Sequence, residues 1–253
     1  MAGARVRTGR GMSGKTRKLT TAVLVLGTML SIALGAMALV AVKGFHAETA
    51  TLRALDFADR LSLRLRSIER QVVGFAAHMS TMDRLDPLAF ARFYEASLLG
   101  PSDELPSEFA FMPELESSEL ALLDHFVATT GGRYRAAGYP DWRPGAPADG
   151  IIHLPVVMAE PPAARTRLLG FDLAHALTQF DAAQRAIATG SLALSDPIPL
   201  GDPVNDGAYR LLLVAPVRLA SGAAAELGGT VWRGAVAASI DPEPILQSVL
   251  ATL

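Results

Sequence analysis

One uncharged stretch constrains this chain more than any other feature: residues 19–42 contain no charged side chain. As an α-helix, such a stretch would extend about 36 Å, enough to cross a hydrocarbon core of about 30 Å. Six cationic residues and no acid precede it in residues 1–18. Basic flanks stay in the cytoplasm by the positive-inside rule. The sequence therefore predicts a basic cytoplasmic tail at 1–18, a transmembrane helix at 19–42 and a body outside the membrane.

A secretory signal peptide is the alternative, because it also combines a basic start with an apolar middle. Its apolar region is usually about 7–15 residues long, shorter than this one. The small residues Ala36-Met37-Ala38 resemble a cleavage site. We expect an uncleaved, single-pass anchor in the cell inner (plasma) membrane, with the body periplasmic or extracellular.

Two patterns predict self-association. Gly27, Ser31 and Gly35 lie four residues apart in the apolar stretch, a spacing that lets two membrane helices approach closely. Residues 43–82 then read as a stalk helix with an apolar seam: Leu61, Leu65, Ile68, Val72, Phe75 and Met79. Such a seam pairs with its copy in a dimer or packs on its own domain. We expect a homodimer through the membrane and stalk helices, and the seam alone leaves both packings open.

The body is acidic. Residues 44–253 hold 16 arginines, no lysine and all 25 acidic residues, a net charge near −9. Nucleic acid is excluded as a partner, because its phosphates demand a basic face. The chain has no cysteine, which excludes disulfides, thiol nucleophiles and cysteine-ligated zinc.

The pattern of the body predicts an α+β fold. Helices are expected at 87–99, 117–130 and 173–189, the last capped by Asp172 and ended by Gly190, with a short helix after Asp241-Pro242. An irregular connection is expected at 101–118. Strands are expected at 151–158, 168–171, 191–195, 208–217 and 229–240, the last two as an antiparallel hairpin with a loose tip. The expected result is a small antiparallel sheet with helices packed to one side.

The order of these segments resembles the CHASE family, the extracellular sensory domains of bacterial, plant and amoebal receptors. The segments that carry the resemblance are "PLAFARFYEASL", "FMPELESSELALLDHFV", "HLPVVMAEPP", "LLGFDL", "AAQRAIATGSLALSDPIPL" and "LLLVAPV". They stand in family order within about residues 60–250. The resemblance implies a long stalk helix followed by two PAS-like modules, whose division the sequence leaves open, and we expect a CHASE-like sensory domain at 83–253.

The resemblance also implies a ligand pocket within the sheet. Plant members bind adenine-type cytokinins there, oriented by an aspartate after the proline-valine strand and a threonine after the alanine-rich helix. The aspartate's place aligns with Pro161, next to Glu160, and the threonine's place with Ser195. The hydroxyl is kept and the acid is lost or shifted by one position. This difference argues against cytokinin as the ligand, but not against ligand binding.

The first predicted strand would place Leu154, Val156 and Met158 on one face, because side chains alternate along a strand. Binding sites are typically apolar with a few placed polar groups. The same residues can equally well fill an ordinary core. The candidate ligand-binding residues are Val156, Met158, Glu160, Phe171, Leu194, Ser195 and Leu213.

The predicted function is sensory input for signal transduction: a small molecule of unknown identity binds outside and shifts the stalk helices. No Gly-x-Ser-x-Gly elbow and no histidine pair at metal-ligand spacing occur. We therefore expect no catalytic residue, no metal and no cofactor. A kinase or cyclase module and a second membrane helix would have to follow "ILQSVLATL" at the end of the sequence. The alternative is a stand-alone or scaffold-type membrane-anchored binding protein without a signalling output.

Overall fold

A computed structural model of the chain describes residues 51–98, 106–199, 209–228 and 233–252. The predicted tail, membrane helix and first part of the stalk lie outside these ranges. Among the described residues, no helix is both long enough and apolar enough to cross a membrane. The chain divides into two compact units, Met1–Asp56 and Phe57–Leu253. In the first unit, residues 51–56 are described and are helical.

The second unit begins with a long helix, residues 57–81, called here the N-terminal helix. The predicted apolar seam becomes buried from Ile68 onward, where Val72, Phe75 and Met79 are fully enclosed. Leu65, one step earlier in the seam, is 46% exposed. From Ile68 to its end, the seam therefore packs on its own domain, one of the two packings that the sequence left open.

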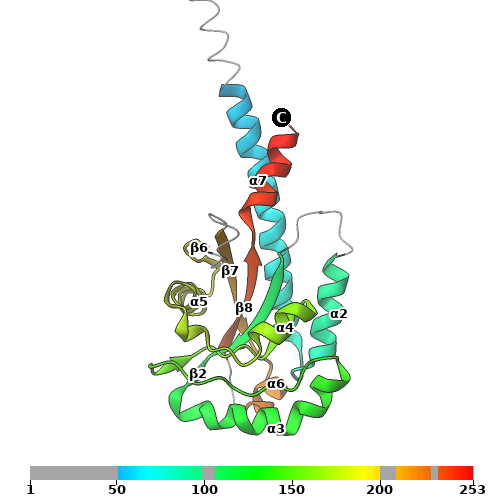
Figure 1. Ribbon diagram of the computed structural model, residues 1–253, viewed down its shortest axis with the longest axis vertical. Helices are drawn as coiled ribbons and strands as arrows, with labels where there is room; N and C mark the ends of the chain where they lie inside the picture. The colour runs from blue at the N-terminus through cyan, green and yellow to red at the C-terminus, as the bar shows by residue number, and fades with distance from the viewer. Residues whose placement is uncertain (1–50, 99–105, 200–208, 229–232, 253) are drawn as a thin grey trace, which may run out of the picture. The chain divides into compact units, whose positions relative to one another are not determined.

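The later helices and strands follow in a mixed order (Figure 1). The α-helices are α2 (Pro87–Leu98), α3 (Leu120–Ala136), α4 (Pro162–Leu168), α5 (Leu177–Thr189), α6 (Ser221–Glu226) and α7 (Pro242–Ala251). Two 3-10 turns are η1 (Ser117–Glu119) and η2 (Leu173–His175). The strands are β1 (Glu108–Pro113), β2 (Leu115–Glu116), β3 (Ile152–His153), β4 (Met158–Glu160), β5 (Ala193–Leu194), β6 (Ile198–Pro199), β7 (Tyr209–Arg218) and β8 (Arg233–Ile240).

The main sheet is antiparallel, with strand order β4-β1-β8-β7-β5 and β6 also paired to β7. β1 lies between β4 and β8, with Phe111 opposite Met158 on one side and Val236 on the other. The segment that was expected to be an irregular connection thus supplies an internal strand. That expectation was wrong because Pro106 precedes the strand and Pro113 is its last residue, while Phe109 to Pro113 are all buried.

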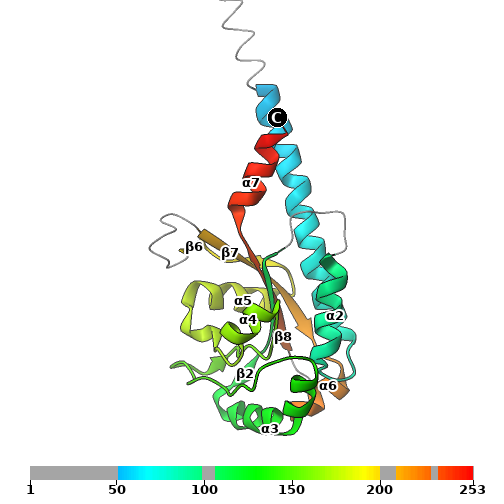
Figure 2. The ribbon, with the colours of Figure 1, turned by 45° about the vertical axis from the view of Figure 1, so that its right-hand side comes forward.

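Helices cover both faces of this sheet, so the expectation of helices on one side was also wrong. The N-terminal helix, α2, α3 and α6 contribute to one core, and α4 and α5 contribute to the other. Figures 1 and 2 show α5 and the N-terminal helix on opposite sides of the strands. The physical reason is that both faces of the strands are apolar. On β8, Val236 and Ala238 face the first core, while Ala235 and Ala237 face the second.

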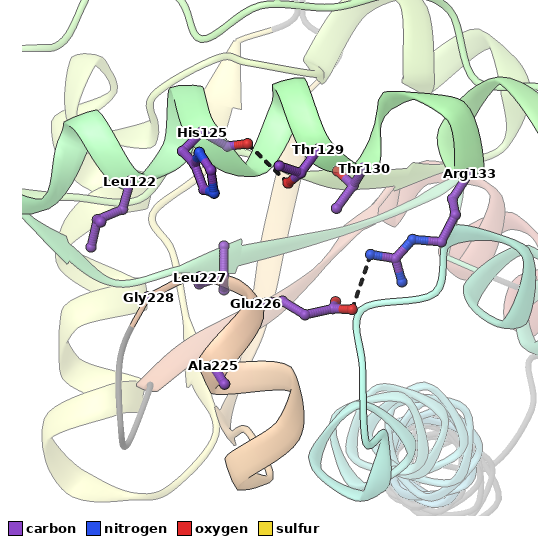
Figure 3. A pocket seen from close by; sticks show the side chains of 9 residues that line it. All are labelled: Leu122, His125, Thr129, Thr130, Arg133, Ala225, Glu226, Leu227 and Gly228. Atoms are coloured by element: carbon purple, nitrogen blue, oxygen red, sulfur yellow. Dashed lines mark hydrogen bonds and ion pairs between the residues drawn. The ribbon is translucent and has the colours of Figure 1, made fainter.

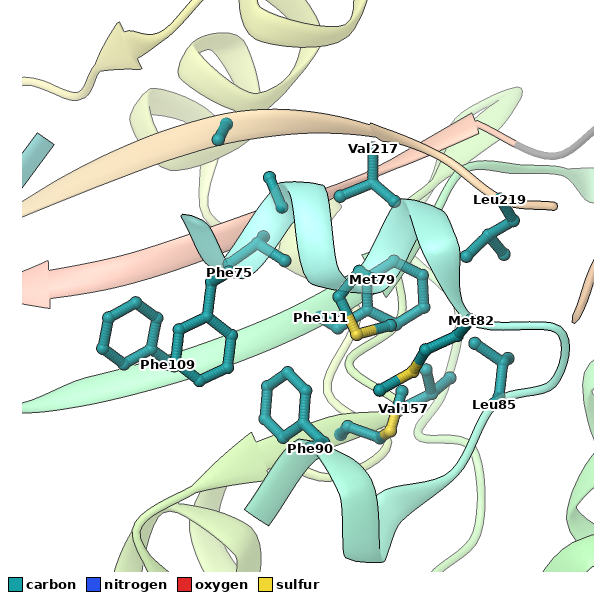
Figure 4. Close-up of a cluster of buried hydrophobic side chains, with 14 of the residues drawn as sticks. Phe75, Met79, Met82, Leu85, Phe90, Phe109, Phe111, Val157, Val217 and Leu219 are labelled. Carbon is teal, nitrogen blue, oxygen red and sulfur yellow. The ribbon is translucent and has the colours of Figure 1, made fainter. Parts of the chain in front are cut away.

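The first core is aromatic and methionine-rich (Figure 4). Phe75 of the N-terminal helix stacks on Phe109 of β1, with 4.2 Å between ring centroids, and meets Phe90 of α2 edge-on. The second core is formed largely by methyl groups. Ala182, Ala183 and Ala186 of α5 are fully buried in the same cluster as the alanines of β8.

Three expected elements take a different form. The predicted strand at 151–158 is divided into β3 and β4, with Pro155 forming an isolated bridge to Asp172. The predicted strand at 168–171 is the end of α4 and a turn at Gly170, whose φ of 78° favours glycine. Helix α3 continues past Gly131-Gly132 to Ala136, because the next turn buries the ring of Tyr134.

Several local predictions are confirmed. The β7–β8 hairpin forms as expected, although its tip contains α6 rather than only a loose loop. Asp172 accepts a hydrogen bond from the Ala174 N–H, and Gly190 ends α5 with a left-handed φ of 67°. Asp241 caps α7 in the same way. The expected helix 173–189 is nevertheless divided: Asp172 caps the short turn η2, and α5 begins at Leu177 without a side-chain cap.

Candidate ligand-binding site

The seven residues that the sequence singled out do not converge on one cavity. Met158 and Glu160 belong to β4, whereas Leu194 belongs to β5, at the opposite edge of the sheet. Val156 and Met158 pack in different cores, because the strand expected to carry both is interrupted. The structure does bring two smaller groups together. Phe171 accepts a backbone hydrogen bond from Val156, and Leu194 and Leu213 are register partners with Ser195 beside them.

Exposure also separates these residues. Val156, Met158, Glu160 and Ser195 are buried, Leu213 is half-buried, and Phe171 and Leu194 are 38% and 48% exposed. The Ser195 hydroxyl accepts from the Leu212 N–H and donates to the Asp196 carbonyl. Its hydrogen bonds thus lie within its own strand pair. Ligand binding by this set of residues remains a prediction.

Glu160 forms a buried ion pair with Arg165. The two side chains are 2% and 10% exposed. Arg165 Nη2 donates to both carboxylate oxygens, at 2.6 Å and 2.8 Å, and Nε donates to one of them at 3.0 Å. The Tyr139 hydroxyl donates to the same carboxylate at 3.0 Å. Burial raises the pKa of Glu160, although the bonds from Arg165 and Tyr139 act in the opposite direction. Arg165 also donates to the carbonyls of Ala137 and Gly138, so this cluster joins α4 to the segment after α3.

A second cluster connects the buried side chains of Asp172 and His153 to the exposed Ser117, and nothing in the sequence indicated it. Asp172 Oδ2 lies 2.7 Å from His153 Nδ1, and His153 Nε2 lies 3.1 Å from Ser117 Oγ. The backbone N–H groups of Leu154, Ala174 and Ala148 also donate to the Asp172 carboxylate. Burial alone would raise the pKa of Asp172, but these hydrogen bonds outweigh it and lower that pKa.

The order Ser–His–Asp is that of a nucleophile, a base and an orienting acid. The Ser117 hydroxyl also lies 2.8 Å from the Gly150 carbonyl and 3.3 Å from the Ile151 carbonyl, so the imidazole is one of three partners for its single proton. The cluster ties η1 to β3 and to the segment before it. Among the described residues, no group of three or more His, Asp and Glu side chains is placed to hold a metal ion.

A pocket of about 400 Å³ lies between α3 and α6 (Figure 3). Its lining combines four polar or charged side chains on one helix, one acid on the other and small or apolar groups between them. The lining residues are Leu122, His125, Thr129, Thr130, Arg133, Ala225, Glu226, Leu227 and Gly228. None of the seven sequence candidates is among them. The volume is at the lower end of the range typical of small-molecule sites, about 300–1,000 Å³.

Glu226 connects this pocket to the end of the N-terminal helix. Its Oε1 accepts from Arg133 Nη2 at 3.0 Å across the pocket, and the two side chains are 24% and 35% exposed. Its Oε2 accepts from the Leu85 N–H at 3.0 Å. Leu85 lies in the short segment between the N-terminal helix and α2. One carboxylate therefore holds three elements together: α3, α6 and the segment that leaves the N-terminal helix.

The same segment touches α6 through a glycine. A Cβ at Gly222 would lie 2.3 Å from the Asp83 carbonyl oxygen, closer than any side chain can approach. Glycine thus permits the backbone of α6 to lie directly against the segment after the N-terminal helix. The sequence interpretation missed this contact because "SGAAAE" was taken as a loose tip. A run of small residues ending in an acid was the available signal.

Comparison with known proteins places these features in context. A family model described as "CHASE domain" matches residues 83–253. Among solved structures, the chain is similar to the ligand-binding domain of the amino acid chemoreceptor PctC of Pseudomonas aeruginosa PAO1, in complex with GABA, at 19% sequence identity and a TM-score of 0.37. That match covers 83% of this chain, and the chain spans 65% of that domain. No curated protein matches the chain significantly.

Proposed function

The chain belongs to the CHASE domain family, and on that premise we propose that it is the ligand-sensing input region of a membrane-bound signalling receptor. A small molecule binds the body outside the cell and changes the position of the stalk helix. The uncharged stretch at 19–42 anchors the chain in the plasma membrane, and the cationic residues before it keep the N-terminus in the cytoplasm. Stalk and membrane helices of two copies form a homodimer on this proposal.

The chain itself carries out no catalysis on this proposal. A kinase or cyclase module attached to the receptor supplies the output. The antiparallel sheet with helices on both faces serves as one PAS-like module, and the N-terminal helix serves as its stalk. Support for this assignment comes from the burial of the seam from Ile68 onward, which couples that helix directly to the sheet.

The ligand site in this proposal is the α3/α6 pocket. One observation carries the assignment: Glu226 lines the pocket and also holds the Leu85 N–H, just after the N-terminal helix. A ligand that contacts Glu226 changes the hydrogen bond that retains this segment. A ligand shifts a conformational equilibrium only by its differential affinity for the two states. Glu226 provides this difference in affinity, because one of its carboxylate oxygens lies in the pocket and the other accepts a hydrogen bond from the stalk segment.

Thermal unfolding of the full chain tests the site. The chain is screened against purines, amino acids and organic acids, and compounds that raise its melting temperature are measured again on Ala225→Phe. Ala225 is exposed and lines the pocket, so the larger side chain fills it. Ala128→Phe is the matched control, since Ala128 is exposed on α3 but does not line the pocket. The expected stabilisation is lost in Ala225→Phe alone. Equal stabilisation of both variants would place the ligand elsewhere.

Coupling to the stalk is tested by spin labels. The chain has no cysteine, so Glu69→Cys and Asp124→Cys introduce two labels without background. Both positions are exposed, the first on the N-terminal helix and the second on α3. The expected result is a ligand-dependent change in the distance distribution between the labels. An unchanged distribution at saturating ligand would refute stalk coupling through this pocket.

A further inference from the structure

The walls of the α3/α6 pocket restrict the chemistry of its ligand, and the inference below rests on the proposed function of that pocket. Two threonines line it on α3. The Thr129 hydroxyl lies 2.9 Å from the His125 carbonyl and 3.1 Å from the Phe126 carbonyl, which share its proton. The Thr130 hydroxyl donates to the Phe126 carbonyl at 2.6 Å. A hydroxyl has a single proton. Both threonines therefore offer a ligand only lone pairs, and with the Glu226 carboxylate the pocket is rich in hydrogen-bond acceptors.

Arg133 supplies the complementary charge. Its guanidinium forms an ion pair with Glu226 at 3.0 Å, and both side chains are reachable from solvent. The two side chains are 35% and 24% exposed, so solvent screens part of their attraction, but either group still loses a charged partner when the other is taken away. A simple anion that takes Arg133 would leave Glu226 without a cation. A simple cation that takes Glu226 would leave Arg133 without an anion.

From these contacts we infer that the pocket binds a small zwitterion, with a carboxylate on Arg133 and an ammonium group on Glu226. The carboxylate accepts the guanidinium N–H groups in a charge-assisted, planar geometry. The ammonium group has three N–H donors, which match the Glu226 carboxylate and the lone pairs of Thr129 and Thr130. The ligand is neutral overall, as is the Arg133–Glu226 pair that it separates.

Insertion of the zwitterion replaces a direct contact between α3 and α6 by a bridged one. Glu226 then moves with the ammonium group while its other oxygen still faces the Leu85 N–H. When Glu226 moves away from Arg133, its hydrogen bond with the Leu85 N–H, in the segment after the N-terminal helix, is therefore changed as well. Ligand recognition and the connection to the stalk thus depend on the same carboxylate.

Isothermal titration calorimetry of the full chain tests the inference. The probes are glycine, β-alanine and 5-aminovalerate, which separate the two charges by different lengths. Each is paired with its N-acetyl form, which lacks the ammonium group, and its amide form, which lacks the carboxylate. At least one zwitterion is expected to bind, and both of its modified forms are expected to bind about tenfold to a hundredfold more weakly, the effect of losing one charged hydrogen-bond partner.

Variants separate the roles of the two charges. Arg133→Gln and Glu226→Gln are each expected to weaken zwitterion binding by the same order, while Arg133→Lys retains the cation and loses less. Thermal unfolding of each variant confirms that it is folded before titration. Ala128→Phe is expected to bind as the wild type does. Equal binding of a zwitterion and its N-acetyl form, or unchanged binding by both Gln variants, would overturn the inference.

The two proposals fail in different ways. If a compound binds the wild type, and its binding is abolished by Ala225→Phe but unchanged by Arg133→Gln and Glu226→Gln, the pocket is a ligand site and the zwitterion inference is wrong. If no compound shows a dependence on Ala225→Phe, the pocket is not a ligand site, and both proposals are overturned.

Discussion

Replacing Arg165 by methionine provides the most decisive test of the buried polar network. The side chains of Arg165 and Glu160 are 10% and 2% exposed, and the guanidinium contacts the carboxylate through two nitrogens. Methionine has similar length and no charge, so Arg165→Met removes the cation without opening a large cavity. The Glu160 carboxylate then stays buried with only the Tyr139 hydroxyl as a side-chain donor.

The expected cost follows from the burial of the remaining charge. Breaking a buried pair by removing one partner typically costs about 3–5 kcal/mol. The guanidinium also lies 4.3 Å from the centroid of the Tyr139 ring, a contact worth about 0.5–2 kcal/mol in its own right. For a domain of this size, about 3–5 kcal/mol corresponds to a fall in melting temperature of about 6–20 °C.

The stability lost in Arg165→Met is expected to depend on pH, and the direction of that dependence follows from the pKa of Glu160. Burial raises the pKa of Glu160, and removing Arg165 removes the main opposing interaction, so that pKa rises further. A carboxyl with a raised pKa in the folded state contributes stability at low pH, which is lost as the pH rises through the folded-state pKa. The deficit of Arg165→Met relative to the wild type is therefore expected to shrink between pH 7 and pH 5.

Chemical denaturation at both pH values measures the effect, with Glu160→Gln/Arg165→Met as the control. The double variant removes both charges, and the glutamine still accepts from Tyr139, so at least half of the lost stability is expected to return. A deficit below about 1 kcal/mol for the single variant at pH 7 would contradict the reasoning, because an uncompensated buried charge costs more than that. A deficit that is the same at pH 5 would contradict it as well.

Two further predictions concern backbone contacts and the cluster of Asp172, His153 and Ser117. Gly222→Ala is expected to lower the free energy of unfolding by about 1–3 kcal/mol, because its Cβ would lie 2.3 Å from the Asp83 carbonyl oxygen. Gly132→Ala, in α3 with nothing within 4 Å of the added Cβ, is expected to raise the free energy of unfolding by about 0.5–1 kcal/mol. Urea denaturation of both variants measures the contrast, and two changes of the same sign would refute it. The hydrogen bonds that lower the pKa of Asp172 contribute stability above its unfolded-state pKa that is lost as the pH falls through the folded-state value. The free energy of unfolding is therefore expected to fall more steeply with falling pH in the wild type than in Asp172→Asn, which keeps the shape of the side chain but cannot ionise beside His153. Equal slopes would argue against a stabilising role of the Asp172 carboxylate.

Features set by local backbone geometry were predictable from the sequence. Asp172 and Asp241 each bond to the N–H two residues further along, and Gly190 adopts the left-handed conformation at a helix end. Each of these depends on a few adjacent residues. The stalk seam was also predictable, because its period is a property of one helix, but its partner was not.

Features that depend on distant pairing were not predictable. β1 is a strand because its residues pair with β8, more than a hundred positions later, as Phe111 does with Val236. The α3/α6 pocket likewise requires a hairpin tip to meet a helix far away in the sequence. The family resemblance directed attention to Glu160 and Ser195, and both side chains have hydrogen-bond partners within the fold. No local pattern marks the pairing of Arg133 with Glu226.

The two cores differ in how easily a helix packed on them can shift against the sheet. A methyl group has no alternative rotamer, so the alanine layer between α5 and the sheet cannot accommodate a displacement by rearranging its side chains. Methionine is unbranched and flexible; Met79, Met82 and Met158 lie in the opposite core, whereas Met112 lies with the alanines. We therefore expect a shift of the N-terminal helix against the sheet to need less rearrangement of side chains than a shift of α5.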